Sequence, residues 1–350
     1  MKNVEIIGAG LSGCVMARLL ADKGYRVTLY EKENHIGGLL YDENYNNVYY
    51  QMKGPHVFHT NNEKIVNFLT RFTDIINFPL SIRANIDKKI TFNPFNFSTI
   101  DTFYDEEKAK VLKEKLYNKY GNETTITKLL DDEDSDIKEY ANFLYEKDYK
   151  QYTSKQWGID PETIDKSVLA RVPVRFNYDT VFRNEKYIFL PKEGYHNMLK
   201  KMIDHENIKL VLNKQIFKKD AIYTGPIDEL LNYKFGKLAY RSLRFEFKRN
   251  EEQKYPVIVY PSLEYRHTRV CDYKQFYTKN KGSILAYEYP EDFDGNNDRC
   301  YPILTEENKK KYQKYKEEAK DLILFGRLAE FKYYDMDTII ERAFEISGGI

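Results

Sequence analysis

The first residues whose type and spacing suit a chemical role are three glycines near the N-terminus. Gly8, Gly10 and Gly13 follow an apolar run at residues 4–7 and precede a segment typical of a helix. Gly8 permits a tight strand-to-helix turn, Gly10 lets a pyrophosphate approach the backbone, and Gly13 brings the helix close to the strand. Because the N-terminus of a helix attracts phosphates, the pattern predicts a binding site for an adenine dinucleotide.

A carboxylate after the second apolar run, residues 26–30, supports this interpretation. Glu31 stands at the distance from Gly13 expected of an acid that accepts hydrogen bonds from ribose hydroxyls, and it favours an unphosphorylated ribose over NADP. The run EKENHIGG that begins at Glu31 ends on Gly37 and Gly38, which let the chain pass tightly along a second segment of the cofactor. This extension resembles the glutathione-reductase and amine-oxidase class of flavoproteins and favours FAD over NAD. The alternative is an ordinary glycine turn after a Rossmann strand.

The composition argues against several functional classes. Among 350 residues, 55 lysines and arginines nearly balance 54 aspartates and glutamates, so no overall charge favours nucleic acid or an anionic membrane. No apolar run is long enough to span a bilayer, and the first strand begins too early to leave room for a signal peptide. We therefore expect a cytoplasmic protein that binds no nucleic acid and does not insert into a membrane.

The potential metal ligands form no convincing site. The three cysteines share no spacing typical of a disulfide framework or a zinc site. His56 and His59 have a spacing that could suit a metal, but the sequence offers no third ligand cluster nearby. We therefore expect no metal and assign the two histidines to the wall of the cofactor cleft.

The chain is long enough for two or three domains, and its apolar patterns predict an α/β fold. A Rossmann-like FAD-binding domain, discontinuous in the sequence, comprises residues 1–78, 192–232 and 320–350. A helical insertion domain comprises residues 96–170, and a linking helix comprises residues 306–319. An antiparallel β-sheet domain comprises residues 79–95, 171–191 and 233–305.

Two local patterns within these domains make specific predictions. Residues 44–50 alternate in polarity and are expected to form one strand. Residues 101–121 are expected to contain an amphipathic helix with possible caps at Thr102 and Asp105. Its apolar face carries Ala109, Leu112, Leu116 and Tyr120.

A second group of chemically suitable residues lies near the C-terminus. Residues 325–337 predict a short strand, a glycine and the start of a helix capped by Asp335 or Asp337. A helix N-terminus placed in this way stabilises negative charge on the pyrimidine half of a reduced flavin. Arg327 and Tyr333 add a guanidinium fork and a phenol, which suit a second, phosphate-bearing ligand.

Five segments taken together resemble the family of bacterial UDP-galactopyranose mutases, and the resemblance runs through almost the whole chain. The segments are GPHVFHT at 54–60, YTSKQWG at 152–158, RVPVRF at 171–176, YTGPID at 223–228 and GRLAEFKYYDM at 326–336. The resemblance implies a homodimeric FAD enzyme, an isomerase that interconverts UDP-galactopyranose and UDP-galactofuranose without net redox change. Its flavin is active when reduced by an external reductant such as NAD(P)H. The galactofuranose would serve the biosynthesis of a cell-surface polysaccharide.

The resemblance also implies a mechanism and its residues. The reduced flavin N5 attacks the anomeric carbon, displaces UDP and gives a flavin iminium intermediate. Catalysis depends on His56, close to the flavin, and on arginines that hold the departing diphosphate: Arg171, Arg269 and Arg327. Further substrate contacts come from Tyr152, Trp157, Phe182, Tyr301 and Tyr333. Cofactor contacts come from Gly8, Gly10, Ser12, Gly13, Glu31, Lys32, Gly38, Leu39, His56, His59, Gly225, Arg327, Tyr334, Asp335 and Met336.

The sequence also departs from the family pattern. Phe182 stands where many relatives have a tyrosine that contacts the nucleotide, and Lys53 and Cys300 replace aromatic residues. The sugar therefore stays open between galactose, N-acetylgalactosamine on UDP and a deoxy sugar on TDP. Two alternatives from other classes are an FAD oxidoreductase of the amine-oxidase type and a noncatalytic nucleotide-sugar sensor.

Overall fold

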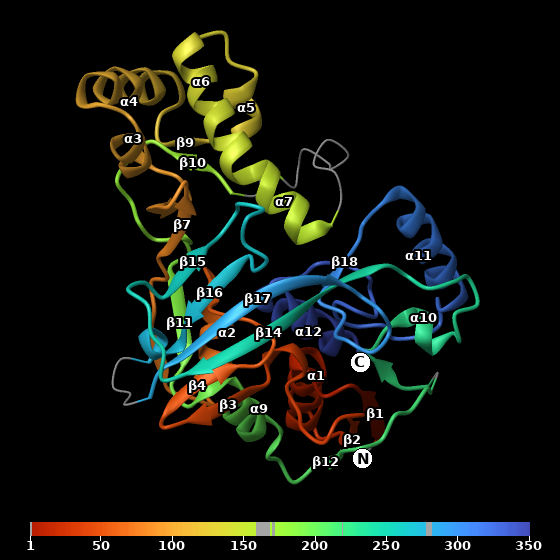
Figure 1. The fold of residues 1–350 in the computed structure, drawn as a ribbon. Helices are drawn as coiled ribbons and strands as arrows, with labels where there is room; N and C mark the ends of the chain where they lie inside the picture. The colour runs from red at the N-terminus through yellow and green to blue at the C-terminus, as the bar shows by residue number, and fades with distance from the viewer. Residues whose placement is uncertain (1, 159–168, 170–171, 219, 278–281) are drawn as a thin grey trace. The chain divides into compact units, whose positions relative to one another are not determined.

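The computed structural model describes residues 2–158, 169, 172–218, 220–277 and 282–350, which form two compact units (Figure 1). The first unit comprises Met1–Phe78, Glu185–Leu243 and Asp292–Ile350. The second unit comprises Pro79–Asn184 and Arg244–Glu291. The finer division into three domains that we drew from the sequence stays a prediction.

A parallel sheet organises the first unit. Its strands lie in the order β12-β2-β1-β13, with bounds Ile208–Val211, Arg26–Tyr30, Asn3–Ile7 and Ile222–Tyr223. All three pairings are parallel, which requires crossover connections between the strands. Helix α1 (Leu11–Asp22) is such a crossover; it buries Val15 and Leu20 and packs against α9 (Gly194–Ile203) and α12 (Met336–Gly349). The predicted α/β fold with a Rossmann-like domain is confirmed.

Smaller elements complete the first unit. A three-stranded sheet has the order β5-β11-β6, with bounds Phe58–Thr60, Tyr187–Pro191 and Ile75–Asn77. The sequence analysis assigned residues 187–191 to the antiparallel β-sheet domain, but β11 pairs with β5 and β6 of the first unit. The remaining elements are η1 (Gly38–Leu40), β3 (Asp42–Tyr45), β4 (Val48–Gln51), α2 (Glu63–Leu69), α10 (Ile227–Leu230), β18 (Tyr301–Pro302) and α11 (Glu306–Glu318).

Residues 44–50 do not form the single strand that their alternation suggested. Asn46 and Asn47 adopt φ values of 50° and 67°, and the chain reverses there to form the hairpin of β3 and β4. Two consecutive residues with positive φ build the tight turn that suits the twist of a hairpin, and asparagine tolerates this conformation. The asparagine pair was therefore the turn signal within the alternating pattern.

The second unit contains a mixed sheet. Its strands lie in the order β14-β17-β16-β15-β7-β8, with bounds Tyr240–Arg249, Ile284–Asp292, Arg269–Asp272, Val257–Val259, Ile82–Ile86 and Lys89–Asn93. The first residues of β14 belong to the first unit, where Arg241 pairs with Tyr301 of β18. The pairs β16/β17, β15/β16 and β7/β8 are antiparallel, whereas β7 and β15 run parallel. The parallel pair joins distant segments of the chain, so no hairpin turn fixes its direction.

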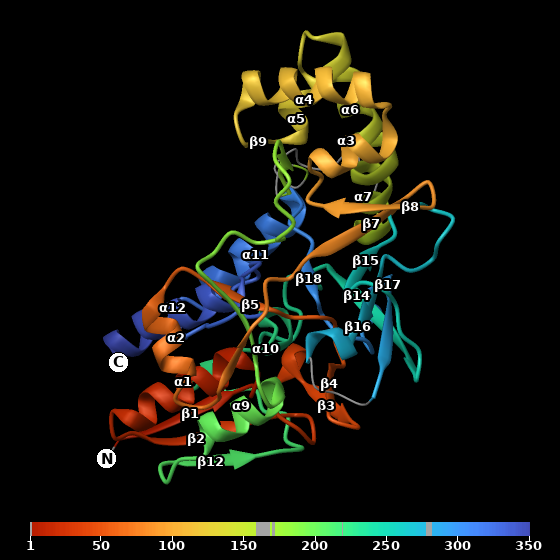
Figure 2. The same ribbon diagram turned by 90° about the vertical axis from the view of Figure 1, so that its left-hand side faces the viewer.

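Helices cluster at one end of the second unit, as Figure 2 shows for α3 to α6. The predicted apolar face is confirmed, because Ala109, Leu112 and Leu116 are at most 2% exposed. Of the two possible caps, Asp105 is confirmed, since it accepts a hydrogen bond from the Lys108 N–H at 2.9 Å, whereas Thr102 lies within the preceding helix, α3. Outside the mixed sheet, the elements of the second unit are α3 (Phe97–Phe103), α4 (Glu106–Tyr120), β9 (Glu123–Thr124), α5 (Ile126–Leu130), α6 (Ser135–Leu144), the π-helix η2 (Tyr145–Tyr149), α7 (Lys150–Trp157), β10 (Val174–Arg175) and the 3₁₀ helix η4 (Tyr273–Phe276).

A buried carboxylate connects the end of α4 to the start of α6. Asp132 accepts hydrogen bonds from Lys119 Nζ (2.6 Å), from the Asp134 N–H (2.8 Å) and from the Tyr120 hydroxyl. Burial opposes ionisation of this carboxyl, but the hydrogen bonds outweigh burial and hold the pKa of Asp132 at about 2, below its ordinary value of 3.8.

We expect Asp132→Asn to destabilise the protein by about 1–3 kcal/mol at pH 7, because three donors lose an ionised acceptor. The exposed neighbour provides a control, Asp131→Asn, which should change the free energy of unfolding by less than about 0.5 kcal/mol. Because the folded pKa of Asp132 is lowered, its contribution is complete above about pH 4 and disappears as the pH falls toward about 2. Urea unfolding followed by circular dichroism should show the effect of Asp132→Asn shrinking over that interval. An effect independent of pH would contradict the assigned charge.

Candidate functional site

The first unit contains a cavity of about 520 Å³. Most of the residues that the sequence assigned to a cofactor lie in its wall, although they come from distant parts of the chain. They are Gly8, Gly10, Ser12, Glu31, Lys32, Gly38, Leu39, His56, Gly225, Arg327, Tyr334 and Met336. Three other predicted residues, Gly13, His59 and Asp335, are not among the lining residues.

The three glycines of the first turn differ in what a side chain would meet at each position. A Cβ atom at Gly8, where φ is +99°, would lie 2.2 Å from Thr224 Oγ1, and one at Gly13 would lie 1.8 Å from the Gly8 carbonyl oxygen. Neither position accepts a side chain. A Cβ atom at Gly10 would meet nothing within 4 Å, so the space beside this residue is open to a ligand.

Glu31 holds the glycine-rich turn in place. Its carboxylate is 8% exposed and accepts hydrogen bonds from the Ala9 N–H (2.7 Å) and the Glu33 N–H (3.1 Å). The carbonyl of Ala9 in turn accepts a hydrogen bond from the Gly37 N–H at 2.8 Å. A Cβ atom at Gly38 would lie 3.4 Å from Gly10 Cα, so the second glycine pair passes directly along the first turn.

Two helices begin at the cavity without a side-chain cap. Helix α1 begins after Gly10 and helix α12 begins after Asp335, and neither N-cap residue provides a side-chain hydrogen bond. Asp335 thus occupies the predicted N-cap position without capping through its carboxylate, while Asp337 Oδ1 accepts from the Thr338 N–H at 2.7 Å. Uncapped N–H groups carry the positive end of the helix dipole, so both helix starts favour an anionic or electron-rich ligand.

Arg327 lies among aromatic side chains beside the start of α12. Its guanidinium donates hydrogen bonds to the carbonyl oxygens of Cys300 (3.0 Å) and Tyr334 (3.1 Å). Its Cζ atom lies 5.0 Å from the centre of the Tyr333 ring, which stacks on Tyr301 at 6.2 Å. The structure therefore brings together three residues that the sequence assigned to the substrate, Arg327, Tyr301 and Tyr333.

The two predicted histidines have different surroundings. His56 Nδ1 lies 2.8 Å from the Gly54 carbonyl oxygen, which can only accept, so Nδ1 carries the hydrogen and Nε2 is the basic nitrogen of the neutral ring. Buried Gln51 accepts from the His56 N–H and fixes this segment. His59 instead lies on β5, where its Nδ1 is 3.0 Å from Glu185 Oε1.

Arg269 of the second unit is held by a buried acid. Its Nε and Nη2 atoms lie 3.0 and 2.5 Å from Glu288 Oε2, and Glu288 is 1% exposed. The Thr268 hydroxyl donates to the other carboxylate oxygen of Glu288 at 3.1 Å. Burial raises the pKa of Tyr152 to about 12. The positive charge of Arg269 lowers this pKa and the negative charge of Glu288 raises it, so Tyr152 lies within the electrostatic reach of this ion pair.

The other predicted substrate residues of the second unit lie on different segments. Trp157 is half-buried at the end of α7, and the N–H of Phe182 donates to the Leu80 carbonyl at 2.8 Å. Arg171 lies outside the described residues.

Sequence reasoning missed several residues of these sites. The loops 214–217 and 296–299 also line the cavity, but nothing in their sequences indicates that they meet the glycine-rich turn. Glu288 lies on an otherwise largely apolar and aromatic strand, and an acid within such a strand was an available signal of a buried ion pair.

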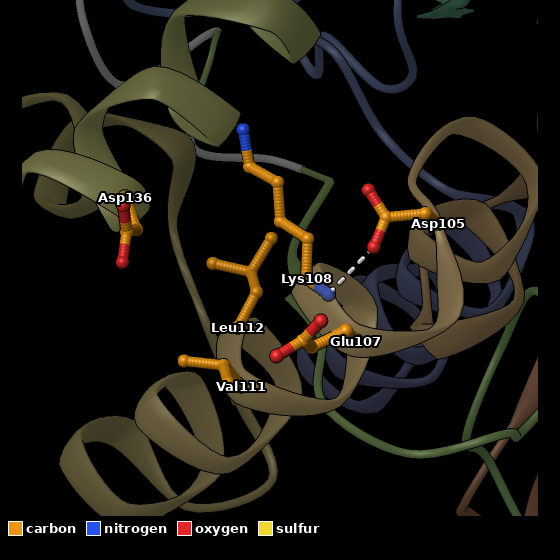
Figure 3. A pocket seen from close by; sticks show the side chains of 6 residues that line it. All are labelled: Asp105, Glu107, Lys108, Val111, Leu112 and Asp136. Atoms are coloured by element: carbon orange, nitrogen blue, oxygen red, sulfur yellow. Dashed lines mark hydrogen bonds between the residues drawn. The ribbon is translucent and has the colours of Figure 1, made fainter.

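A second hollow, of about 340 Å³, lies on the helices of the second unit (Figure 3). Three of its four polar side chains have partners, because Asp105 caps α4, Lys108 Nζ lies 2.9 Å from Glu139, and Asp136 pairs with Lys115 at 2.6 Å. None of the predicted site residues lines it.

In the part of the chain that the structure describes, we find no helix with the length and apolarity needed to cross a membrane.

The parallel sheet, the glycine-rich turn and the acid after the second strand define a Rossmann-like nucleotide-binding protein. The profile of NAD(P)-binding Rossmann-like domains matches residues 6–72, and the profile of UDP-galactopyranose mutases matches residues 147–333. The chain belongs to the UDP-galactopyranose mutase family, and it is therefore an enzyme of the isomerase type.

Relatives extend this similarity over nearly the full chain. A probable UDP-galactopyranose mutase of Klebsiella pneumoniae is 33% identical over 98% of this chain and 93% of its own length. A dTDP-fucopyranose mutase of Escherichia coli is 32% identical over 99% of this chain and 97% of its own. Among solved structures, a reduced UDP-galactopyranose mutase has the same fold, with a TM-score of 0.74 at 14% identity over 99% of this chain and 93% of that one.

We expect Glu288→Gln to lower the free energy of unfolding by about 2–3 kcal/mol, because it leaves the partly buried guanidinium of Arg269 without its counter-ion. A matched control on the same strand is Glu291→Gln, whose partner Arg244 and whose own side chain are each 39% exposed. Exposed pairs contribute little, so this control should cost less than about 1 kcal/mol in urea unfolding. Equal losses in the two variants would show that Glu288 does not anchor Arg269.

Proposed function

We propose that this protein interconverts the pyranose and furanose forms of a nucleotide sugar, with UDP-galactose as substrate and reduced FAD as cofactor. The observation that carries the proposal is the cavity that two uncapped helix starts, Glu31 and Arg327 all line. Membership of the mutase family supports the reaction type.

The residues of the cavity fit FAD. The open space beside Gly10 admits a pyrophosphate close to the start of α1, where backbone N–H groups can donate to it. The Glu31 carboxylate offers acceptors for the adenosine ribose. The start of α12 would stabilise negative charge on the pyrimidine half of a flavin. When bound and reduced, the flavin supplies an electron-rich ring nitrogen as a nucleophile toward the sugar.

The protein's own task is to hold the nucleoside diphosphate that leaves and returns. By resemblance to the family, Arg171, Arg269 and Arg327 would bind its phosphates. Tyr301 and Tyr333 would donate from their hydroxyls, while Tyr152, Trp157 and Phe182 would contact the nucleotide and sugar. Each charged hydrogen bond of this kind contributes about 1.5–3 kcal/mol.

His56 would lie close to the reacting atoms. Because the Gly54 carbonyl fixes the hydrogen on Nδ1, a neutral imidazole presents Nε2 as an acceptor. We assign to His56 the role of a hydrogen-bond acceptor at the reacting centre. His59 would act indirectly, through β5, on the segment that carries His56.

The identity of the sugar nucleotide is the open part of the proposal. A relative that acts on a dTDP-fucopyranose matches this chain as fully as those named for UDP-galactopyranose. A TDP-deoxy sugar is therefore the second candidate, and UDP-N-acetylgalactosamine the third. We further propose that the protein is a cytoplasmic homodimer. An external reductant such as NAD(P)H would reduce its flavin.

The function is tested with dithionite-reduced holoprotein and a panel of furanose nucleotides. We expect UDP-galactofuranose to be converted to the pyranose form, with no turnover when the flavin is oxidised, in a chromatographic assay of products.

Arg269→Ala should retain FAD and lose about 10- to 100-fold in kcat/KM, because one charged phosphate contact is missing. Absence of turnover across UDP- and TDP-sugars would reject the proposal. Substrate-dependent flavin reduction with peroxide release would instead identify an oxidoreductase.

The glycines provide a sharper test of the cofactor site. We expect Gly10→Ala to fold normally, because its φ of −74° suits alanine and its Cβ meets no atom within 4 Å, yet to bind FAD about tenfold more weakly or worse. The control Gly348→Ala also places a Cβ atom in open space, away from the cavity, and should bind FAD normally. The measurements are the flavin absorbance per chain and an FAD titration of the apoprotein.

In contrast, Gly13→Ala should lower the melting temperature of the apoprotein, because its Cβ would overlap the Gly8 carbonyl. Normal FAD affinity in Gly10→Ala would show that the pyrophosphate does not lie beside this turn.

A further inference from the structure

Lys155 on α7 is surrounded by backbone oxygens. Its Nζ atom donates to the carbonyls of Tyr260 (2.5 Å), Ser262 (2.9 Å), Tyr265 (2.9 Å) and His267 (2.9 Å). An ammonium group has three hydrogens and accepts nothing, so four carbonyls saturate its donors. Among the described residues, no carboxylate lies within ion-pair distance of Lys155, which separates this contact from the surface ion pairs of the helical region.

The four carbonyls belong to one closed loop, which we call the 260–268 loop. The N–H of Tyr260 donates to the Thr268 carbonyl at 2.8 Å and closes the base of the loop. Several carbonyl oxygens that point at one place repel one another unless a cation lies between them. Burial lowers the pKa of Lys155 to about 8, so the ammonium is mostly charged at neutral pH and can fill this place.

Aromatic side chains pack around the same loop. The His267 ring makes edge contacts with Tyr260 and Tyr287, at centroid distances of 4.6 and 5.3 Å. Burial lowers the pKa of His267 to about 4, with the Lys155 charge acting in the same direction, so at neutral pH this imidazole is uncharged while Lys155 is mostly charged. The ammonium therefore has an uncharged imidazole nearby, and the four carbonyls are its binding partners.

The loop leads directly into the arginine that we assign to the substrate. His267 is followed by Thr268, whose N–H donates to the Glu288 carbonyl at 2.8 Å, and then by Arg269. On the other side, α7 carries Tyr152 and Trp157 within three residues of Lys155. One ammonium group thus connects the helix that bears two proposed substrate aromatics to the strand that bears the proposed phosphate-binding arginine.

We propose that Lys155 is a positioning residue for the nucleotide-sugar site: it holds the 260–268 loop on α7 and thereby sets Arg269 relative to Tyr152 and Trp157. It does so without touching the substrate. This inference rests on the proposed function, because it concerns the binding of a nucleoside diphosphate by these three residues.

The test compares Lys155→Met, which replaces lysine by an unbranched side chain one atom shorter and removes its charge, with the control Lys150→Met. Lys150 lies on the same helix, is half-buried and pairs with Glu146 at 3.1 Å on the exposed side. We expect Lys155→Met to weaken UDP binding in calorimetry by about tenfold and to raise KM for the UDP-sugar more than it lowers kcat. FAD content should stay at the wild-type level, and amide hydrogen exchange should accelerate within residues 260–268. Lys150→Met should match the wild type in all four measurements.

Chemical rescue separates positioning from general stability. Lys155→Cys alkylated with bromoethylamine restores an ammonium at nearly the length of lysine and should recover UDP affinity and loop protection. The parent protein is the alkylation control, because Cys14, Cys271 and Cys300 are buried.

Each outcome bears on a separate claim. Wild-type UDP affinity in Lys155→Met, or no recovery after alkylation, would overturn the inference while leaving the proposed function intact. If the wild-type protein binds neither UDP nor TDP, the proposed function fails. Unchanged exchange of the 260–268 loop in Lys155→Met would then overturn the role of the ammonium as well.

Discussion

The close approach of α1 to the end of β1 is the constraint on which the first unit depends. At Gly13 the helix passes so near the Gly8 carbonyl that a Cβ atom would lie 1.8 Å from that oxygen. Only this approach lets the helix begin directly at the turn, with its first N–H groups directed at the cavity. Larger residues would push the helix away and move its dipole from the place where the proposed cofactor's pyrophosphate would lie. The Glu31 carboxylate and the second glycine pair are arranged around this same turn.

The two described arginines of the proposed substrate site are restrained in electrostatically different ways. Arg269 is paired with the buried Glu288 carboxylate, so the pair carries no net charge and contributes mainly a fixed orientation. Arg327 is held by the neutral carbonyls of Cys300 and Tyr334 and therefore keeps its full positive charge. In the proposed reaction, Arg327 would supply the larger attraction for a diphosphate, and Arg269 would supply directed hydrogen bonds.

Local patterns were predictable from the sequence, whereas contacts between distant segments were not. The glycine-rich turn, the position of Glu31 after β2 and the apolar face of α4 follow from spacing within a few turns of chain, and the structure agrees with them. The hairpin at Asn46 and Asn47 was missed because its two strands share one alternating pattern. The parallel pairing of β7 with β15 and the cavity loops 214–217 and 296–299 have no local signal, since long-range packing alone creates them.

The hydrogen bonds around Ala9 determine what a cofactor would encounter. Its N–H is held by Glu31 and its carbonyl by Gly37, so the glycine-rich turn is ordered by protein groups alone. Fixing one backbone residue costs about 1–2 kcal/mol in conformational entropy, and this cost is met when the chain folds, before any ligand arrives. Binding to such a preorganised turn needs little rearrangement, so the affinity of the empty protein for its cofactor is governed by the hydrogen bonds that the cofactor forms and by the water that it displaces.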